Sequence, residues 1–138
     1  MEILDAVRAA GAAGTSAVGA IPTDAQIVIA VLNGEAGPAI ERRRFVRNTY
    51  QTPGAIESIG EPIPRRWTIY TRDANQWGVG FVTQEPLPIA KDVILHVAAA
   101  GQVLSLRGCI VRSREVMPGW YDGAVLLNEE EPRLALTT

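Results

Sequence analysis

The pattern of hydrophobic and polar positions changes near residue 50 and divides the chain into a helical part and an extended part. Residues 23–33 carry a nearly continuous apolar run, which follows Pro22 and ends at Asn33 and Gly34. Thr23 or Asp24 supplies a helix-capping side chain at its start. This segment therefore predicts a helix over about residues 23–33. Residues 1–20 end in a low-complexity stretch rich in Ala and Gly, and we expect most of them to form a poorly ordered tail.

From Tyr50 onward, short extended segments alternate with turns rich in Gly and Pro. Apolar and polar side chains alternate in "WTIYT", which is the period of a strand with one buried face. We expect strands at residues 55–59, 65–72, 79–82, 92–99, 103–114 and 120–127. Short connections require antiparallel pairing, and closure removes exposed edges. The pattern thus predicts a mainly β protein, a six-stranded antiparallel barrel with a short N-terminal helical extension.

The same pattern gives the expected domain organisation. Residues 1–40 form the N-terminal extension, residues 41–128 the barrel domain and residues 129–138 a C-terminal tail. We expect the tail to be solvated, with an apolar contact through Leu134 and Leu136.

Composition and charge narrow the functional classes. The chain has 138 residues and a formal net charge of -2, which argues against binding to polymeric nucleic acid. Cys109 is the single cysteine and cannot form an internal disulfide. The N-terminus is acidic where a signal peptide needs basic residues, and no apolar stretch is long enough to span a membrane. We expect a cytoplasmic protein.

Positive charge is nevertheless concentrated between residues 41 and 73, where seven arginines meet four acids for a local balance of +3. The arginines are Arg42, Arg43, Arg44, Arg47, Arg65, Arg66 and Arg72. The planar guanidinium binds phosphate through two parallel hydrogen bonds and stacks on flat bases. An arginine run is often only a solvated face, so this cluster needs a second signal.

A second signal follows the predicted strand at residues 65–72. Asp73, Asn75 and Gly78 stand at the spacing D-x-N-x-x-G in "RDANQWGVGF", which we interpret as a turn. Asp and Asn side chains offer hydrogen-bonding groups in turns, and Gly78 permits a close backbone approach or a positive φ.

Together, Arg43-x-x-x-Arg47 and Asp73-x-Asn75-x-x-Gly78, followed by the strands up to residue 127, resemble the PilZ domain. The resemblance covers about residues 41–127. The usual second motif of that family is D/N-x-S-x-x-G, and this chain has Asn75 where the serine is expected. PilZ domains are six-stranded antiparallel barrels that bind the bacterial second messenger cyclic di-GMP and pass the signal to a partner.

The resemblance implies roles for individual residues. Arg43 and Arg47 would clamp the phosphates and contact guanine, and Asp73 would accept hydrogen bonds from a guanine edge. Asn75 and Gly78 would line the turn below the ligand. Further candidates for ligand binding are Arg42, Arg44, Arg72 and Trp77.

Several of these further candidates have ordinary structural interpretations as well. Trp77 either stacks on a purine or, as we favour, caps the mouth of the barrel. Arg72 is equally compatible with a phosphate contact and with a surface charge. Arg112 and Arg114 share one face of a strand, where an ordinary solvent-facing pair is the favoured interpretation.

His96 and Cys109 are the remaining residues with reactive side chains. Each lies in an alternating strand pattern without a third ligand or an orienting acid at a recognisable spacing. We therefore expect no enzyme, no metal site and no cofactor other than the ligand cyclic di-GMP.

Two alternatives to the receptor stay open. The first is a barrel that does not bind the nucleotide and acts as a protein-interaction module through its N-terminal helix. The second is a small binder of single-stranded nucleic acid that uses the arginines with Trp67 or Trp77, although it needs a longer basic track. We expect no output domain, so the signal would leave through a changed surface that a downstream protein partner recognises. A ligand-dependent rearrangement of the arginine-rich arm, which folds over the ligand, is the switch that we expect.

Overall fold

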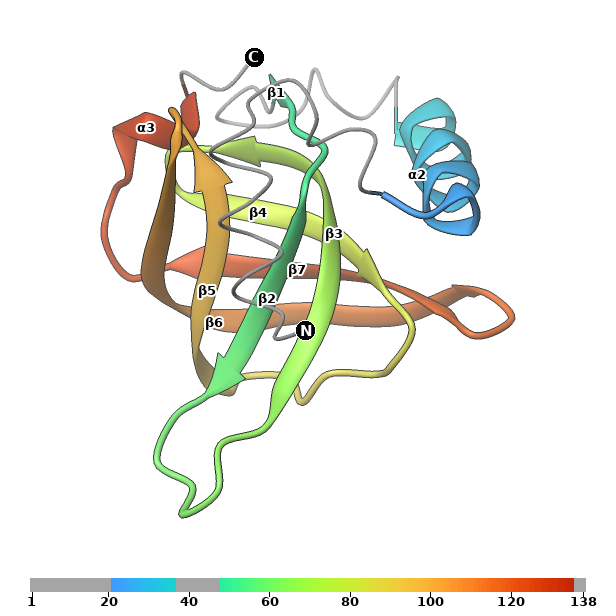
Figure 1. Cartoon of the computed structure of the whole chain (residues 1–138). Coiled ribbons are helices and arrows are strands. Elements are labelled where there is room, and N and C mark those ends of the chain that lie inside the picture. The colour runs from blue at the N-terminus through green and yellow to red at the C-terminus, as the bar shows by residue number, and fades with distance from the viewer. Residues whose placement is uncertain (1–20, 37–47, 136–138) are drawn as a thin grey trace.

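The computed structural model describes residues 21–36 and 48–135 (Figure 1). Its elements, in chain order, are α2 (Thr23–Ala36), β1 (Asn48–Thr49), β2 (Pro53–Ser58), β3 (Arg66–Asn75), β4 (Gly78–Thr83), β5 (Asp92–Ala99), β6 (Gln102–Met117), β7 (Trp120–Leu127) and α3 (Pro132–Ala135).

Strands β2 to β7 close into one antiparallel barrel. Hydrogen-bonded neighbours follow the order β3, β2, β5, β6, β7, β4, and the pairing of β4 with β3 closes the ring. The two-residue strand β1 pairs with β3 beyond the end of β2, on the edge of β3 that lies opposite β4. The predicted six-stranded antiparallel barrel with a helix before it is confirmed, and closure leaves few unpaired strand edges.

The interior of the barrel is filled by the alternate apolar positions of its strands. Ile69, Phe81, Leu95, Ile110 and Val125 are completely or almost completely buried in one hydrophobic cluster. The residues between them point outward, as the two-residue period of a strand requires. This alternation places the charged residues of β3, β6 and β7 on the outer face.

Helix α2 packs on that outer face beside the hairpin of β6 and β7 (Figure 1). Ala25, Val28, Ile29 and Leu32 recur at helical spacing and are buried against Val82, Trp120 and neighbouring side chains. The helix begins at Thr23 as predicted and continues three residues beyond the expected end.

Strands β3 and β6 extend furthest beyond their predicted ends. β3 continues to Asn75 and β6 continues to Met117, because each is extended by pairing with the next strand of its own hairpin. The expected solvated tail also needs correction at Leu134, which is fully buried in the barrel cluster from the short helix α3. The predicted contact through Leu134 is therefore confirmed, whereas Leu136 lies outside the described residues.

Within the described ranges 21–36 and 48–135, no helix is both long enough and apolar enough to cross a membrane.

Candidate functional site

Asp73, Asn75 and Gly78 lie at the hairpin that joins β3 to β4. The sequence placed Asp73 and Asn75 in a turn, but both belong to β3, and the turn consists of Gln76 and Trp77 alone. Asn75 pairs with Gly78 across this two-residue turn. The Asn75 Oδ1 accepts a hydrogen bond of 2.8 Å from the backbone N–H of Trp77, which ties the side chain to the turn.

Gly78 is required by the packing of β4 on β7. A Cβ at this position would lie 2.8 Å from the carbonyl oxygen of Val125, closer than side chains approach a backbone oxygen. The residue does not have a positive φ, so of the two predicted reasons only the close approach applies. The backbone that approaches Gly78 so closely belongs to β7.

Strand β1 brings the end of the arginine-rich segment beside this hairpin. Asn48, which follows Arg47 in the chain, pairs with Ala74, and Thr49 pairs with Asp73. The predicted ligand residues Arg42, Arg43, Arg44 and Arg47 themselves lie outside the described residues. The chain thus enters the barrel directly alongside the segment that contains Asp73 and Asn75.

Tyr50 anchors the chain immediately after β1. Its hydroxyl donates to the carbonyl oxygen of Ala98, and its backbone N–H donates to the carbonyl oxygen of Arg72 at 3.2 Å. Its own carbonyl oxygen accepts a 2.7 Å bond from the Thr71 hydroxyl. Burial raises the pKa of the Tyr50 phenol, so the hydroxyl stays protonated as a donor. These bonds fix the point where the arginine-rich segment joins the barrel.

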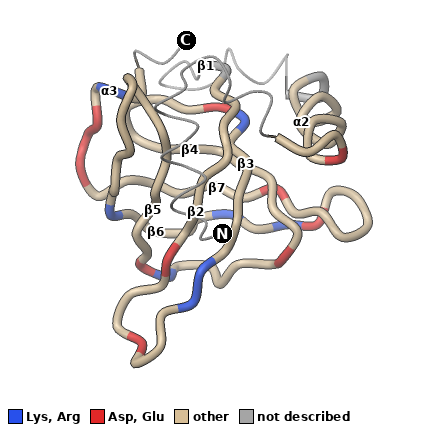
Figure 2. The backbone as a smooth tube through the Cα atoms, viewed as in Figure 1, with Lys and Arg blue, Asp and Glu red and all other residues tan. Residues whose placement is uncertain are grey.

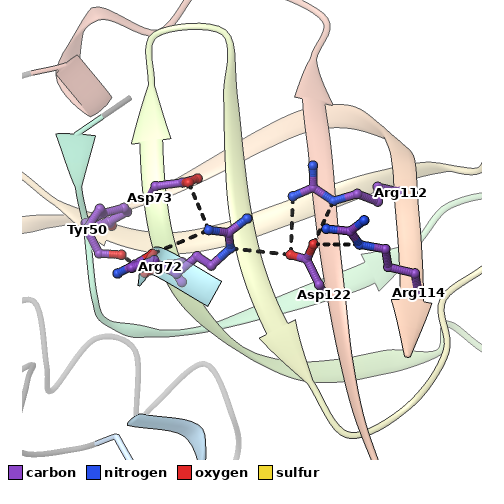
Figure 3. A network of polar contacts seen from close by, with 8 residues as sticks. Tyr50, Arg72, Asp73, Arg112, Arg114 and Asp122 are labelled. Carbon is purple, nitrogen blue, oxygen red and sulfur yellow. Dashed lines mark hydrogen bonds and ion pairs between the residues drawn. The ribbon is translucent and has the colours of Figure 1, made fainter. Parts of the chain in front are cut away.

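Arg72 is not the surface charge that one of its two interpretations predicts, and the predicted phosphate contact stays a prediction. Its side chain is almost completely buried on the outer face, next to a bulge between Thr71 and Asp73 that places Asp73 on the same face. Nη1 lies 3.4 Å from Asp73 Oδ2 and donates to Asn33 Oδ1 of α2 at 3.4 Å. Nε lies 3.3 Å from Asp122 Oδ1 on β7. Arg72 therefore links β3, β7 and α2 (Figure 3).

Asp122 also forms ion pairs with two arginines of β6. Arg112 Nε and Arg114 Nε lie 3.1 Å and 3.2 Å from Asp122 Oδ2, and Arg112 Nη2 donates to Oδ1 at 3.2 Å (Figure 3). The Asp122 carboxylate itself is 0% exposed. Arg112 and Arg114 are thus part of a charged network rather than an ordinary solvent-facing pair, which corrects the favoured interpretation.

We call Arg72, Asp73, Arg112, Arg114 and Asp122 the arginine cluster. Three guanidinium groups and two carboxylates meet in it. Burial strengthens the ion pairs within such a group, because little water screens them. The cluster lies on the outer face of the barrel, beside the D-x-N-x-x-G hairpin.

The sequence did not point to Asp122, and only a weak signal for it exists. It is a lone acid in the otherwise apolar strand "WYDGAVLL". A carboxylate that is surrounded by buried residues requires cationic partners. Arg112 and Arg114, at alternate positions of the preceding strand, were candidates for this role. What the sequence does not contain is the register that places Arg114 opposite Asp122.

Trp67 and Trp77, the two aromatic candidates for base stacking, differ in how far they are buried. Trp67 is buried in the barrel cluster, with the Arg65 guanidinium 4.9 Å from the centre of its ring. It is not available to stack on a base. Trp77 is partly buried in the β3–β4 turn, where its carbonyl oxygen accepts a 2.8 Å bond from the N–H of Leu127.

His96 has the orienting acid that sequence spacing failed to reveal. Its Nε2 lies 3.0 Å from Glu57 Oε1 on β2, and its Nδ1 lies 2.9 Å from the Ser105 hydroxyl on β6. Cys109 is not part of this network, and its Sγ lies 3.8 Å from the carbonyl oxygen of Ile110. No group of three or more metal-ligating side chains occurs within the described part of the chain.

A groove elsewhere on the barrel is lined by residues 105–107 and 128–131. Its rim contains Glu129, Glu130 and Glu131, which disfavours an anionic ligand. No predicted ligand residue lines it. The groove is thus distinct from the arginine cluster.

Comparisons with known proteins show a distant similarity to a solved structure. No family model matches the chain, and a search of curated proteins finds no match. Among solved structures, the barrel is similar to the crystal structure of the PilZ domain of CeSA from a cellulose-synthesizing bacterium, with a TM-score of 0.47 and 16% sequence identity. This similarity covers 67% of the present chain and 90% of that domain.

A closed six-stranded barrel is the fold that the resemblance to PilZ domains implies. At 16% identity, the structural similarity concerns the fold only.

Proposed function

We propose that this chain is a non-catalytic, cytoplasmic receptor that binds cyclic di-GMP and transmits the signal to a protein partner. Binding uses Arg43 and Arg47 of the arginine-rich segment together with Asp73, Asn75 and Gly78 of the β3–β4 hairpin. The two motifs are those by which the sequence resembles PilZ domains.

One observation carries the proposal. Asn48 and Thr49, which follow the first motif in the chain, pair with Ala74 and Asp73 of the second motif, although the two motifs are far apart in sequence. A ligand at this edge of β3 would meet cations from one segment and a carboxylate from the other. That combination suits a guanine nucleotide, since guanidinium groups bind phosphate and guanine acceptors while a carboxylate accepts from guanine N–H donors.

The charge distribution supports a compact anion over a polymer. Lys and Arg alternate with Asp and Glu over the described barrel rather than following one continuous track (Figure 2). Polymeric nucleic acid is held by extended basic surfaces. The local excess of positive charge between residues 41 and 73 matches a ligand with only two phosphates.

Arg43 and Arg47 test this proposal directly. Arg43→Ala and Arg47→Ala should each weaken cyclic di-GMP binding by roughly 1.5 to 3 kcal/mol, because each removes charge-assisted hydrogen bonds. Arg66→Ala is the matched control, since Arg66 belongs to the same arginine-rich part of the sequence but lies at the opposite end of β3 from Asp73. Calorimetric titration measures all three. Wild-type affinity in both Arg43→Ala and Arg47→Ala would refute the assignment.

A second candidate is a protein-interaction module that works through α2 without the nucleotide. Ile27 and Val31 lie one helical turn apart and are 50% and 44% exposed, on the side of α2 that faces away from the barrel cluster. Adjacent exposed apolar side chains are a feature of protein-binding helices. Under this alternative, Ile27→Asp abolishes partner binding and the protein does not bind cyclic di-GMP.

A further inference from the structure

Arg72 connects the D-x-N-x-x-G hairpin to helix α2 through one nitrogen atom. Its Nη1 lies 3.4 Å from Asp73 Oδ2 and donates to Asn33 Oδ1 of α2 at 3.4 Å. Its Nε lies 3.3 Å from Asp122 Oδ1, so the guanidinium is held from a second side (Figure 3). Because a guanidinium is planar and rigid, a displacement of Nη1 at Asp73 also displaces the contact to Asn33.

The burial of Arg72 makes this connection stiff. Its side chain is 4% exposed, so little water reaches the guanidinium. Burial strengthens charged contacts, and a buried donor that loses its acceptor is costly. When the Asp73 carboxylate accepts hydrogen bonds from a ligand, Arg72 therefore readjusts its contacts to Asn33 and Asp122 instead of turning to water.

Helix α2 is the element that can respond to such a readjustment. It lies outside the ring of strands, where its apolar stripe packs on Trp120 and neighbouring side chains. Asn33 adds the hydrogen bond to Arg72 near the end of the helix. On the side that faces away from the barrel, Ile27 and Val31 are exposed. A shift of α2 therefore changes an apolar surface that suits a protein partner.

We infer that Arg72 is a positioning residue that orients Asp73 for cyclic di-GMP and transmits binding to α2 through Asn33. This inference rests on the proposed function, and it makes α2 the element that passes the signal to the protein partner. Coupling between two sites is reciprocal, so the bond from Arg72 to Asn33 also raises the affinity for the ligand.

Asn33→Ala tests this coupling without disturbing the buried charges. It removes the acceptor on α2 and leaves the ion pairs of Arg72 with Asp73 and Asp122 in place. In calorimetric titration with cyclic di-GMP, its Kd should rise about fivefold, the lower end of the usual range for coupled sites. The physical reason is that Nη1 is held less firmly beside Asp73, so the site is less pre-organised.

Two further variants of α2 separate this bond from a general effect of the helix. Asn33→Asp keeps an oxygen that accepts from Arg72, so its Kd should stay within about twofold of the wild-type value. Gln26→Ala is the matched control, since the Gln26 amide donates to the Ile21 carbonyl oxygen and makes no contact with Arg72 among its described hydrogen bonds. Its Kd should also stay within about twofold. Melting temperatures without ligand show that each variant is folded.

The three tryptophans give a second readout, which a merely structural role of Asn33 would not change. Trp77 lies in the β3–β4 turn, Trp120 packs against α2 and Trp67 is buried in the barrel cluster. In nitrogen-15 spectra of the wild type, cyclic di-GMP should shift the indole N–H signals of Trp77 and Trp120 and leave that of Trp67 in place. In Asn33→Ala at saturating ligand, the Trp77 signal should still shift and the Trp120 signal should not.

The outcomes separate the two proposals. If the wild type binds and the Trp120 signal does not move, or moves equally in Asn33→Ala, this inference is overturned and the proposed function stands. If Gln26→Ala weakens binding as much as Asn33→Ala, any change in α2 has the same effect and the inference is also overturned. If the wild type does not bind cyclic di-GMP, both proposals fail.

Discussion

Two polar networks cross the outer face of the same barrel, and they differ in their balance of charge. The arginine cluster joins β3, β7 and β6 through three guanidinium groups and two carboxylates. The histidine network, which consists of Glu57, His96 and Ser105, joins β2, β5 and β6. Both contain buried polar groups that are hydrogen-bonded across strands.

The histidine network is closed. Both ring nitrogens of His96 have partners at 2.9 and 3.0 Å, and Glu57 is also 3.7 Å from Arg66. In the arginine cluster, the side chains of Arg112 and Arg114 are 30% and 64% exposed, although both are paired with Asp122. The difference teaches that a reactive residue type such as His96 can be fully committed to its neighbours, whereas the guanidinium groups of an ion-paired cluster still reach solvent.

The largest expected difference between the networks concerns folding. Asp122→Ala should lower the free energy of unfolding by about 3 to 5 kcal/mol, because it leaves the buried Arg72 and its neighbours without their shared carboxylate. Glu57→Ala, at a partly exposed position, should cost about 1 kcal/mol. Urea denaturation measures both. Asp92→Ala is the control, because it removes an exposed acid. If Asp122→Ala were as stable as Asp92→Ala, the arginine cluster would not be a structural unit.

The next largest effect concerns ligand binding. Asp73→Ala should weaken cyclic di-GMP binding by roughly 1.5 to 3 kcal/mol, because the guanine N–H donors lose a charged acceptor. Glu57→Ala should leave the affinity unchanged, since the histidine network has no part in the site. Titration calorimetry compares the two. Equal losses in both variants would remove the distinction between the networks.

Asn75 gives a smaller effect at the position where the chain departs from the family motif. Asn75→Ser should change the affinity by no more than about 1 kcal/mol, the net value of one hydrogen bond. Serine can also accept from the Trp77 N–H in this turn, although more weakly. If the wild type does not bind and Asn75→Ser creates binding, the interaction-module alternative is favoured.

The smallest effect on binding is expected in the histidine network itself. His96→Ala should leave cyclic di-GMP affinity within experimental error and cost about 1 kcal/mol of stability, through the lost bonds to Glu57 and Ser105. Cys109→Ala is the companion variant on the neighbouring strand. A loss of ligand affinity in His96→Ala alone would place the network in the site.

The sequence predicted what depends on local pattern. Alternation in β3 and the extended segments between turns rich in Gly and Pro identified strands whose short connections require a barrel, and the apolar run between Pro22 and Asn33 identified α2. Asp73 and Asn75 were found by their spacing. Their assignment to a turn was wrong, because pairing with β4 extends the strand through them.

What the sequence could not provide depends on register between strands. The shifts at Thr71/Asp73 and at Ile110/Arg112 decide which side chains meet across the sheet. They place Asp73 opposite Gly80 and Arg114 opposite Asp122. No local period encodes such shifts, and the same holds for the meeting of His96 with Glu57.

The central claim is that this barrel is a receptor for cyclic di-GMP, and calorimetric titration of the unmodified protein tests it most directly. Cyclic di-GMP is titrated into the purified chain, with GTP and a short single-stranded oligonucleotide as controls. The account predicts saturable binding of cyclic di-GMP and none of GTP at the same concentration. Absence of any heat with cyclic di-GMP, or preference for the oligonucleotide, would contradict it.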